Sequence, residues 1–189
     1  DHETIEQFLI NWIIKNKKLI PSLCRKIYEI ETKRFTKEAF RKSLPDYPHP
    51  NNEIFDYVKF DALVPYIEEL IENVDRIKLK DQGELKYSKH LHLCVDNCSK
   101  NRIKDEEHIR LAYPSDKKQK ELGFSTAFIV IGGNTLSRGL TLKGLVSSYF
   151  LRTVKQADTL MQMGRWFGYK IHYELFQRIW ITDTTKILF

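Results

Sequence analysis

The sequence predicts an α/β fold, in which a parallel sheet flanked by helices is preceded by a helical region. In the first part of the chain, apolar residues such as Ile5, Phe8 and Leu9 recur at helical spacing. In the second part, short apolar runs alternate with polar connections and one amphipathic stretch, as is typical of alternating strands and helices. We therefore expect a helical region over residues 1–86 and an α/β lobe over residues 87–189.

The helical region is expected to contain helices separated by proline-rich breaks. Pro21 interrupts the first apolar pattern, since proline removes a hydrogen bond from a helix interior. Three prolines within residues 43–52 exclude a continuous helix or a central strand there. A further helix follows, because Pro65 suits a first helical turn and an apolar stripe runs from Ile67 to Val74.

The expected α/β lobe contains four short segments with the character of strands, which are residues 90–95, 126–131, 146–151 and 177–182. The second of these is a continuous apolar run, which is typical of a strand buried on both faces of a parallel sheet. Thr153 and Gln156 have capping-box spacing and predict a helix through about Phe167. The polar residues 99–121 are expected to form an exposed connection or insertion, which is compatible with a short helix.

Composition limits the function only loosely. The net charge of +6 permits a nucleic-acid partner, but Lys and Arg are interleaved with Asp and Glu, so a solvated surface explains them as well. Three cysteines in 189 residues do not make a disulfide framework, and no apolar run is long enough to span a bilayer. The chain opens on an amphipathic pattern and not on a secretory signal. We expect a cytoplasmic chain with no membrane partner, of unspecified oligomeric state.

The most informative segment runs from Gly132 to Gly144, directly after the apolar run. Its four glycines predict a backbone that turns sharply or approaches another group closely. Arg138 lies within the segment, and a guanidinium there suits a phosphate, a carboxylate or a partner lobe. Ligands of parallel sheets sit beyond the carboxyl ends of the strands, which is where this segment is expected. A glycine-rich turn with a surface arginine explains the pattern equally well.

A second informative segment covers residues 161–170. Gly164 and Gly168 are poor helix formers, each costing about 1 kcal/mol against alanine in a helix interior. Arg165 follows the first glycine and precedes two aromatic residues, a context that would hold its side chain in a defined place. The alternative is an aromatic core patch with one exposed cation.

Together the two segments resemble motifs V and VI of superfamily-two helicases. Residues 134–142, NTLSRGLTL, are similar to motif V, and residues 162–165, QMGR, are similar to motif VI. The sequence is closer still to the endonuclease Z-one domain family, whose members carry segments similar to residues 131–145 and 148–169. The resemblance implies the second RecA-like lobe of an ATP-driven motor acting on DNA. It also implies a bacterial protein that accompanies restriction or phage-defence genes.

The resemblance also implies roles for individual residues. Arg165 would act as an arginine finger on the γ-phosphate, and Gln162 would contact or support the same phosphate. Coupling to ATP and to the partner lobe would involve Gly132, Gly133, Asn134, Ser137, Arg138, Gly139, Thr141 and Gly164. Contacts to nucleic acid would come from Arg138, Lys143 and Lys170. ATP and Mg²⁺ would bind in the full-length protein, whose P-loop lobe would lie upstream.

Three positions depart from the helicase pattern. Met161 stands where motif VI usually has Gln or His, Gly168 stands where a second arginine is usual, and Thr141 stands where motif V has an acid. The nearest later cations, Lys170 and Arg178, are therefore the alternative candidates for the finger. The sequence contains no G-x-x-x-x-G-K-[ST] segment, so we expect this chain alone to be inactive towards ATP.

Two other patterns invite readings that we reject. Asp105–His108 spells a DExH box, but the residues before it are polar, whereas the metal-site acid of such a box should end a buried strand. His90, His92, Cys94 and Cys98 suggest zinc, but the paired short spacings of structural zinc sites are missing. We therefore expect core strand residues with a loop thiol, and no metal site.

Two alternatives to the motor remain open on the sequence. An endonuclease domain that cuts DNA would require a metal-bound carboxylate cluster, which cannot be picked out from scattered Asp and Glu residues. A non-catalytic interaction module would keep the fold without turnover, in line with the departures in motif VI.

Overall fold

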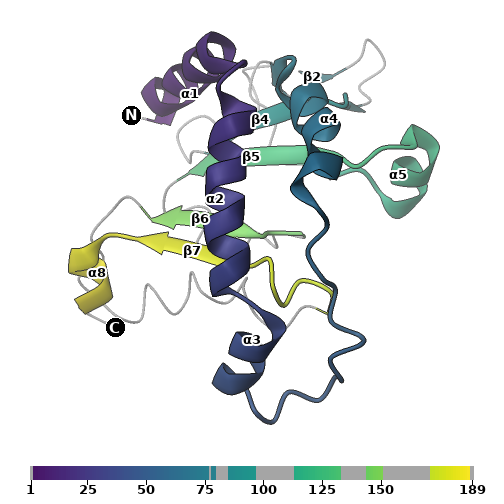
Figure 1. The fold of residues 1–189 in the computed structure, drawn as a ribbon. Coiled ribbons are helices and arrows are strands. Elements are labelled where there is room, and N and C mark those ends of the chain that lie inside the picture. The colour runs from purple at the N-terminus through teal and green to yellow at the C-terminus, as the bar shows by residue number, and fades with distance from the viewer. Residues whose placement is uncertain are drawn as a thin grey trace. The chain divides into compact units, whose positions relative to one another are not determined.

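The computed structural model describes residues 2–76, 78–79, 85–96, 113–132, 144–150 and 171–187 (Figure 1). The chain forms two compact units. The first unit comprises residues 1–26 and 59–138, and the second unit comprises residues 27–58 and 139–189. No helix within the described ranges is long and apolar enough to cross a membrane. The expected boundary between residues 86 and 87 stays a prediction.

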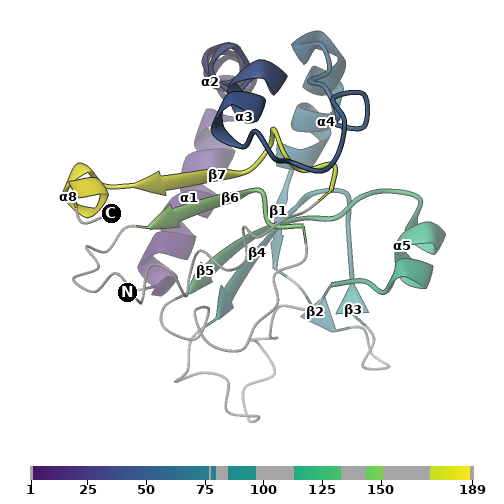
Figure 2. The same ribbon diagram turned by 90° about the horizontal axis from the view of Figure 1, so that it is seen from below.

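The first unit is built on a three-stranded parallel sheet, whose strands lie side by side in Figure 2. Its strands, in spatial order, are β1 (Val74–Arg76), β4 (Leu91–Asp96) and β5 (Ala127–Gly132). Leu91 is opposite Ala127, and His92 is opposite Phe128. Because side chains alternate along a strand, these two pairs lie on opposite faces of the sheet. The parallel sheet with its helices confirms the predicted α/β class.

One face of this sheet carries an apolar core contributed by helices. The helices are α1 (His2–Asn16), the first turns of α2 (Ile20–Arg34) and α4 (Phe60–Ile71). The buried residues of the core are Ile13, Ile20, Ile71 and Leu91, and Cys24, Ile67, Leu70, Val74, Ala127 and Ile129 pack against them. Burial of this apolar surface is the main force that holds helices to a sheet.

Two details of the predicted helices are wrong. α4 begins at Phe60, so Pro65 lies inside the helix and not in its first turn. Val74 does not continue the helix, because the helix ends at Ile71 and Val74 pairs with Leu91 as the first residue of β1. β1 has only three residues, which is too short to show the alternation of a strand in the sequence. Its extended conformation comes from pairing with β4. A break near Pro21 is confirmed, but it lies just before the proline, since α1 ends at Asn16 and α2 begins at Ile20 with Pro21 in its first turn.

The first unit also contains smaller elements. β2 (Lys78–Leu79) and β3 (Leu85–Lys86) form a short antiparallel pair. α5 (Asp116–Leu122) is capped by Ser115, whose hydroxyl accepts a hydrogen bond from the amide of Lys118, and it ends at Gly123 with a left-handed φ of 68°. That conformation suits glycine, which has no Cβ to clash. This helix lies at the end of residues 99–121, where the sequence predicted an exposed connection compatible with a short helix.

The second unit contains the parallel strand pair β6 (Ser147–Phe150) and β7 (Arg178–Ile181), both of which the sequence predicted. It also contains the remaining turns of α2, together with α3 (Lys37–Ser43) and α8 (Asp183–Ile187). The proline-rich residues 44–52 form turns and no helix or strand, as predicted. The expected helix from Thr153 to about Phe167 lies outside the described residues.

Candidate functional site

The carboxyl ends of β4 and β5 meet at one edge of the first sheet. The register places Asp96, the last residue of β4, opposite Gly132, the last residue of β5. The strands behind this edge are fixed by burial, since the exposed fractions of Leu93 and Ile131 are 1% and 8%. Gly132 opens the predicted glycine-rich segment, so that segment leaves the sheet at the end where open α/β sheets hold their ligands.

Most of the predicted site lies beyond the described part of the chain. Gly132 is the predicted site residue that the structure places. The residues outside the described ranges are Gly133, Asn134, Ser137, Arg138, Gly139, Thr141, Lys143, Gln162, Gly164, Arg165 and Lys170. Their roles as phosphate, partner-lobe or nucleic-acid contacts stay predictions.

His92 is a core residue of the first sheet, as the sequence predicted. Its side chain is 1% exposed, and its ring lies 5.1 Å from the ring of Phe128 between centroids. Nδ1 lies 3.2 Å from the carbonyl oxygen of Ala127, and Nε2 lies 3.1 Å from the amide nitrogen of Ser88. A carbonyl only accepts and an amide only donates, so Nδ1 carries the proton and Nε2 accepts.

This environment keeps the imidazole of His92 neutral. Burial lowers its pKa, against the smaller opposing effects of the Ala127 carbonyl and the Asp75 carboxylate. Asp75 itself accepts a hydrogen bond from the hydroxyl of Ser88 at 2.6 Å. With both ring nitrogens engaged, His92 has no lone pair directed at a metal ion.

The other candidate zinc ligands are only partly described. Cys94 is buried, and His90 Nε2 lies 4.0 Å from the carboxylate of Glu72. Within the described ranges, no group of three or more His, Cys, Asp or Glu residues is arranged to hold a metal ion. Cys98 and Asp105–His108 lie outside those ranges, so the expected absence of a metal site and of a catalytic DExH box stay predictions.

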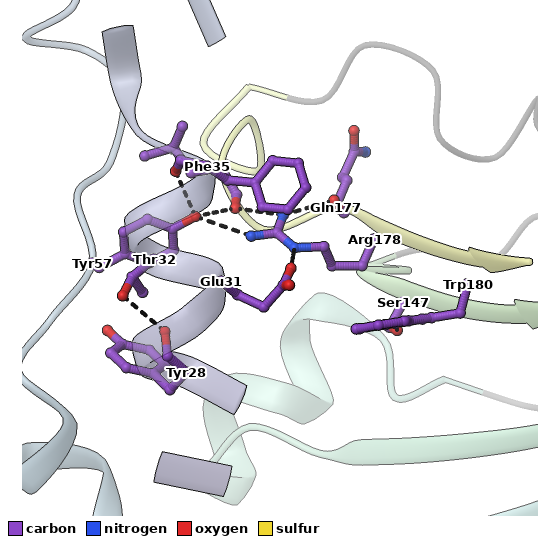
Figure 3. Close-up of polar contacts among 10 residues, drawn as sticks. Tyr28, Glu31, Thr32, Phe35, Tyr57, Ser147, Gln177, Arg178 and Trp180 are labelled. Carbon is purple, nitrogen blue, oxygen red and sulfur yellow. Dashed lines mark hydrogen bonds and ion pairs between the residues drawn. The ribbon is translucent and has the colours of Figure 1, made fainter. Parts of the chain in front are cut away.

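Arg178, an alternative candidate for the finger, is the centre of a polar cluster in the second unit (Figure 3). Its Nε donates to the carboxylate of Glu31 at 2.6 Å, and its Nη1 donates to the carbonyls of Leu175 and Gln177, each at 2.9 Å. Its Nη2 donates to the hydroxyl of Tyr57 at 3.2 Å. We call these five residues, together with Phe35, the Arg178 cluster.

Burial and ring stacking complete the Arg178 cluster. The side chains of Arg178 and Glu31 are 14% and 15% exposed, and the guanidinium carbon lies 3.7 Å from the centroid of the Phe35 ring. The Tyr57 hydroxyl in turn donates to the carbonyl of Leu175 at 2.6 Å. An arginine finger must direct its donors at the γ-phosphate, whereas the donors of Arg178 are directed at groups of its own unit. Arg178 is therefore a structural arginine.

The strand pair β6–β7 also carries an aromatic pair that the sequence analysis missed. Tyr149 and Trp180 are directly opposite in the register, with ring centroids 5.7 Å apart and an interplanar angle of 13°. The Tyr149 side chain is 70% exposed. The alternation of Ser147 with Tyr149, and of Arg178 with Trp180, was the available signal, because residues two apart on a strand share a face.

These observations define an α/β protein whose parallel sheet ends in a glycine-rich segment. The family model of the Z1 domain matches residues 2–189, so the chain belongs to the Z1 domain family. The match confirms the predicted Z-one resemblance and extends it over the helical first part, which carries no motif of its own. No curated protein and no solved structure matches the chain.

Proposed function

We propose that this chain is the second RecA-like lobe of an ATP-driven motor that acts on DNA. The observation that carries the proposal is the position of Gly132. The glycine-rich segment, which contains the motif V resemblance at residues 134–142, begins at this residue, the last of the parallel strand β5. Ligands of open α/β sheets bind beyond the carboxyl ends of the strands, so the segment starts where a nucleotide-responsive loop is needed.

The sheet behind Gly132 supports a coupling role for this segment. β4 pairs with β5 along six residues and with β1 on its other side. Leu93 and Ile131 are buried, so the strand ends cannot shift without disturbing packed side chains. A loop that begins at this rigid sheet keeps its first residue fixed, while its other residues can respond to the nucleotide and to DNA.

The chemical role in this proposal falls on Arg165. The charge that builds on the transferred phosphoryl group is stabilised by a guanidinium, which donates several hydrogen bonds in one plane. Arg178, the later arginine, is engaged in its own cluster, which leaves Arg165 and Lys170 as candidates. Bound ATP would supply the phosphoryl group, and Mg²⁺ would neutralise part of the charge on its phosphates. Both would be held mainly by a P-loop lobe, whose motif this sequence does not contain. The setting that we infer is a bacterial restriction or phage-defence system.

The test is Arg165→Ala in the full-length protein that includes the P-loop lobe. We expect kcat for ATP hydrolysis to fall by about 10³-fold or more, with a modest change in the Kd for ATP, because a finger acts mainly in the transition state. Arg165→Lys should restore little, since an ammonium lacks the planar fork. Arg34→Ala, which removes an exposed arginine of α2, is the matched control and should leave kcat unchanged. A folded Arg165→Ala variant with near-normal kcat contradicts the proposal.

A further inference from the structure

A loop that is distant in the sequence holds the turn of residues 171–177, which precedes β7. The hydroxyl of Tyr47 donates to the carboxylate of Glu174 at 2.7 Å, across 127 positions of the sequence. The ring of Phe55 stacks on the imidazole of His172, with centroids 4.2 Å apart and an interplanar angle of 14°. In Figure 1 the yellow chain before β7 passes beside the blue chain before α4. We call these two interactions the loop–turn contacts.

His172 has a backbone conformation that is rare for a residue with a Cβ. Its φ is 72°, and among the described residues it is the one non-glycine residue with a positive φ. Such a conformation is unfavourable and persists only where the surroundings impose it, and residues of this kind gather at functional sites. The stack with Phe55 and the hydrogen bond to Glu174, two residues later, are contacts that can impose it.

The hydrogen bond from Tyr47 has a charged acceptor. Burial raises the pKa of Glu174, but the Tyr47 hydroxyl and the backbone amides of Glu174 and His172 lower it by more, so the pKa lies below its ordinary value. The carboxylate is therefore ionised at neutral pH. A hydrogen bond to an ionised acceptor is roughly twice as strong as one between neutral groups, so Glu174 links Tyr47 firmly to the turn.

Stability alone does not explain why the stack holds His172 in this conformation. Ile54 and Leu175, next in sequence to Phe55 and Glu174, are each 2% exposed, whereas Phe55 is 55% exposed. A side chain that stays mostly in water gains little from the hydrophobic effect. The stack therefore fixes the position of the turn more than it stabilises the second unit.

Both predicted site segments end at this turn. Lys170, the last residue of the segment that resembles motif VI, is two residues before His172. Gly144, the last residue of the glycine-rich segment, lies against Tyr173, since a Cβ at Gly144 would be 3.9 Å from the Tyr173 hydroxyl oxygen. Directly after the turn, the amide of Arg178 donates to the carbonyl of Val146 at 2.7 Å. The turn thus joins the ends of the two segments.

A segment that is fixed at one end holds its other residues in a narrower range of positions, and a displacement of about 1 Å can cost an enzyme about 10²-fold in rate. We propose that Tyr47, Phe55 and His172 are positioning residues for ATP turnover, because the loop–turn contacts fix the end of the segment that carries Arg165. The inference rests on the proposed function, and it adds the proline-rich loop of the second unit to the parts on which turnover depends.

The first test is Phe55→Ala in the full-length protein that includes the P-loop lobe. We expect kcat for ATP hydrolysis to fall about tenfold to hundredfold, with little change in the Kd for ATP, because the arginine is displaced but the P-loop is not. Phe55→Tyr keeps the stack and should turn over like wild type. Phe8→Ala is the matched control, since Phe8 is 64% exposed on α1 of the first unit and should leave kcat unchanged.

His172→Gly separates positioning from stability. Glycine adopts a positive φ without strain but has no ring to stack on Phe55, so the variant should unfold close to the wild-type temperature and still lose kcat as Phe55→Ala does. The double variant should be no slower than either single variant, since both substitutions break the same contact. A merely structural role predicts instead that kcat falls only where the melting temperature falls.

Hydrogen exchange followed by mass spectrometry gives a readout that needs no ATP. In Phe55→Ala, peptides that cover residues 161–177 should exchange faster than in wild type, whereas peptides from residues 91–96 of the first sheet should not change. Equal exchange over residues 161–177 in the two proteins contradicts the anchoring of this segment, whatever the segment does.

The proposed function and the positioning role can fail separately. A folded Arg165→Ala variant with normal turnover contradicts the motor, and hydrogen exchange still tests the anchor. If Arg165→Ala abolishes turnover while folded Phe55→Ala and His172→Gly variants keep the wild-type kcat, the positioning role alone is wrong.

Discussion

The two compact units hold their parallel strands by different means. In the first unit, β4 lies between two strands and buries Leu91 and Leu93, and the polar His92 within it is neutral. In the second unit, β7 is anchored through Arg178, whose ion pair with Glu31 is mostly buried. In the first unit, the stabilisation of the sheet is spread over many apolar contacts. The second unit buries Ile54 and Leu175 and adds one mostly buried guanidinium, so a single substitution at Arg178 should have a large effect there.

The largest expected effect is the loss of Arg178. Arg178→Met should lower the free energy of unfolding by about 3–5 kcal/mol, because Glu31 would stay buried without its counter-charge. The double variant Glu31→Met with Arg178→Met should recover much of this loss, since apolar pairs of similar volume often replace buried ion pairs without cost. Urea unfolding followed by circular dichroism measures both. A single variant that loses less than 1 kcal/mol would show that the cluster does not anchor the strand.

A smaller effect is expected from pH in the first unit. Burial lowers the pKa of His92, so the unfolded chain takes up its proton at a higher pH than the folded chain does. Stability should therefore be fully present above the unfolded pKa of about 6.5 and should fall as pH drops below it, by at most about 1.4 kcal/mol per pH unit for this one group.

Urea unfolding between pH 7.5 and 5 checks this dependence. His92→Gln should be less stable at pH 7.5 but should show a shallower decline towards pH 5. Identical slopes for His92→Gln and wild type would contradict the assignment of a neutral, buried imidazole.

The smallest effect is expected at an exposed ion pair of similar geometry. Arg25 and Asp61 lie 2.5 Å apart, close to the 2.6 Å of Arg178 and Glu31, but their side chains are 42% and 81% exposed. Asp61→Asn should change the free energy of unfolding by less than about 1 kcal/mol, because water solvates and screens both charges. If this substitution costs as much as Arg178→Met, burial is not what distinguishes the two pairs.

Local signals in the sequence predicted much of the fold. The strands at residues 90–95, 126–131, 146–151 and 177–182 were found because each is a short segment in which apolar residues alternate or follow one another. β1 was missed, since three residues carry no period and its conformation comes from pairing with β4. Pro65 was placed in a first turn because nothing local shows that α4 starts at Phe60.

The sites were harder to predict than the strands. The motif segments were recognised from their residue types alone. Of the site residues predicted in them, Gly132 lies within the described ranges. The Arg178 cluster joins residues from three distant parts of the chain, Glu31, Tyr57 and Arg178, and no spacing rule links them. Tyr149 and Trp180 likewise meet only through strand pairing.

The Arg178 cluster has a consequence for how the chain is made on the ribosome. Glu31 and Arg178 are separated by 147 positions. At roughly 5–20 residues per second, the carboxylate of Glu31 emerges on the order of ten seconds before the arginine that neutralises it. Until then α2 carries an unpaired acid together with the exposed apolar side chains of Ile27 and Ile30. The second unit can close only after Arg178 has left the ribosome, so this interval is when a chaperone would have most reason to bind.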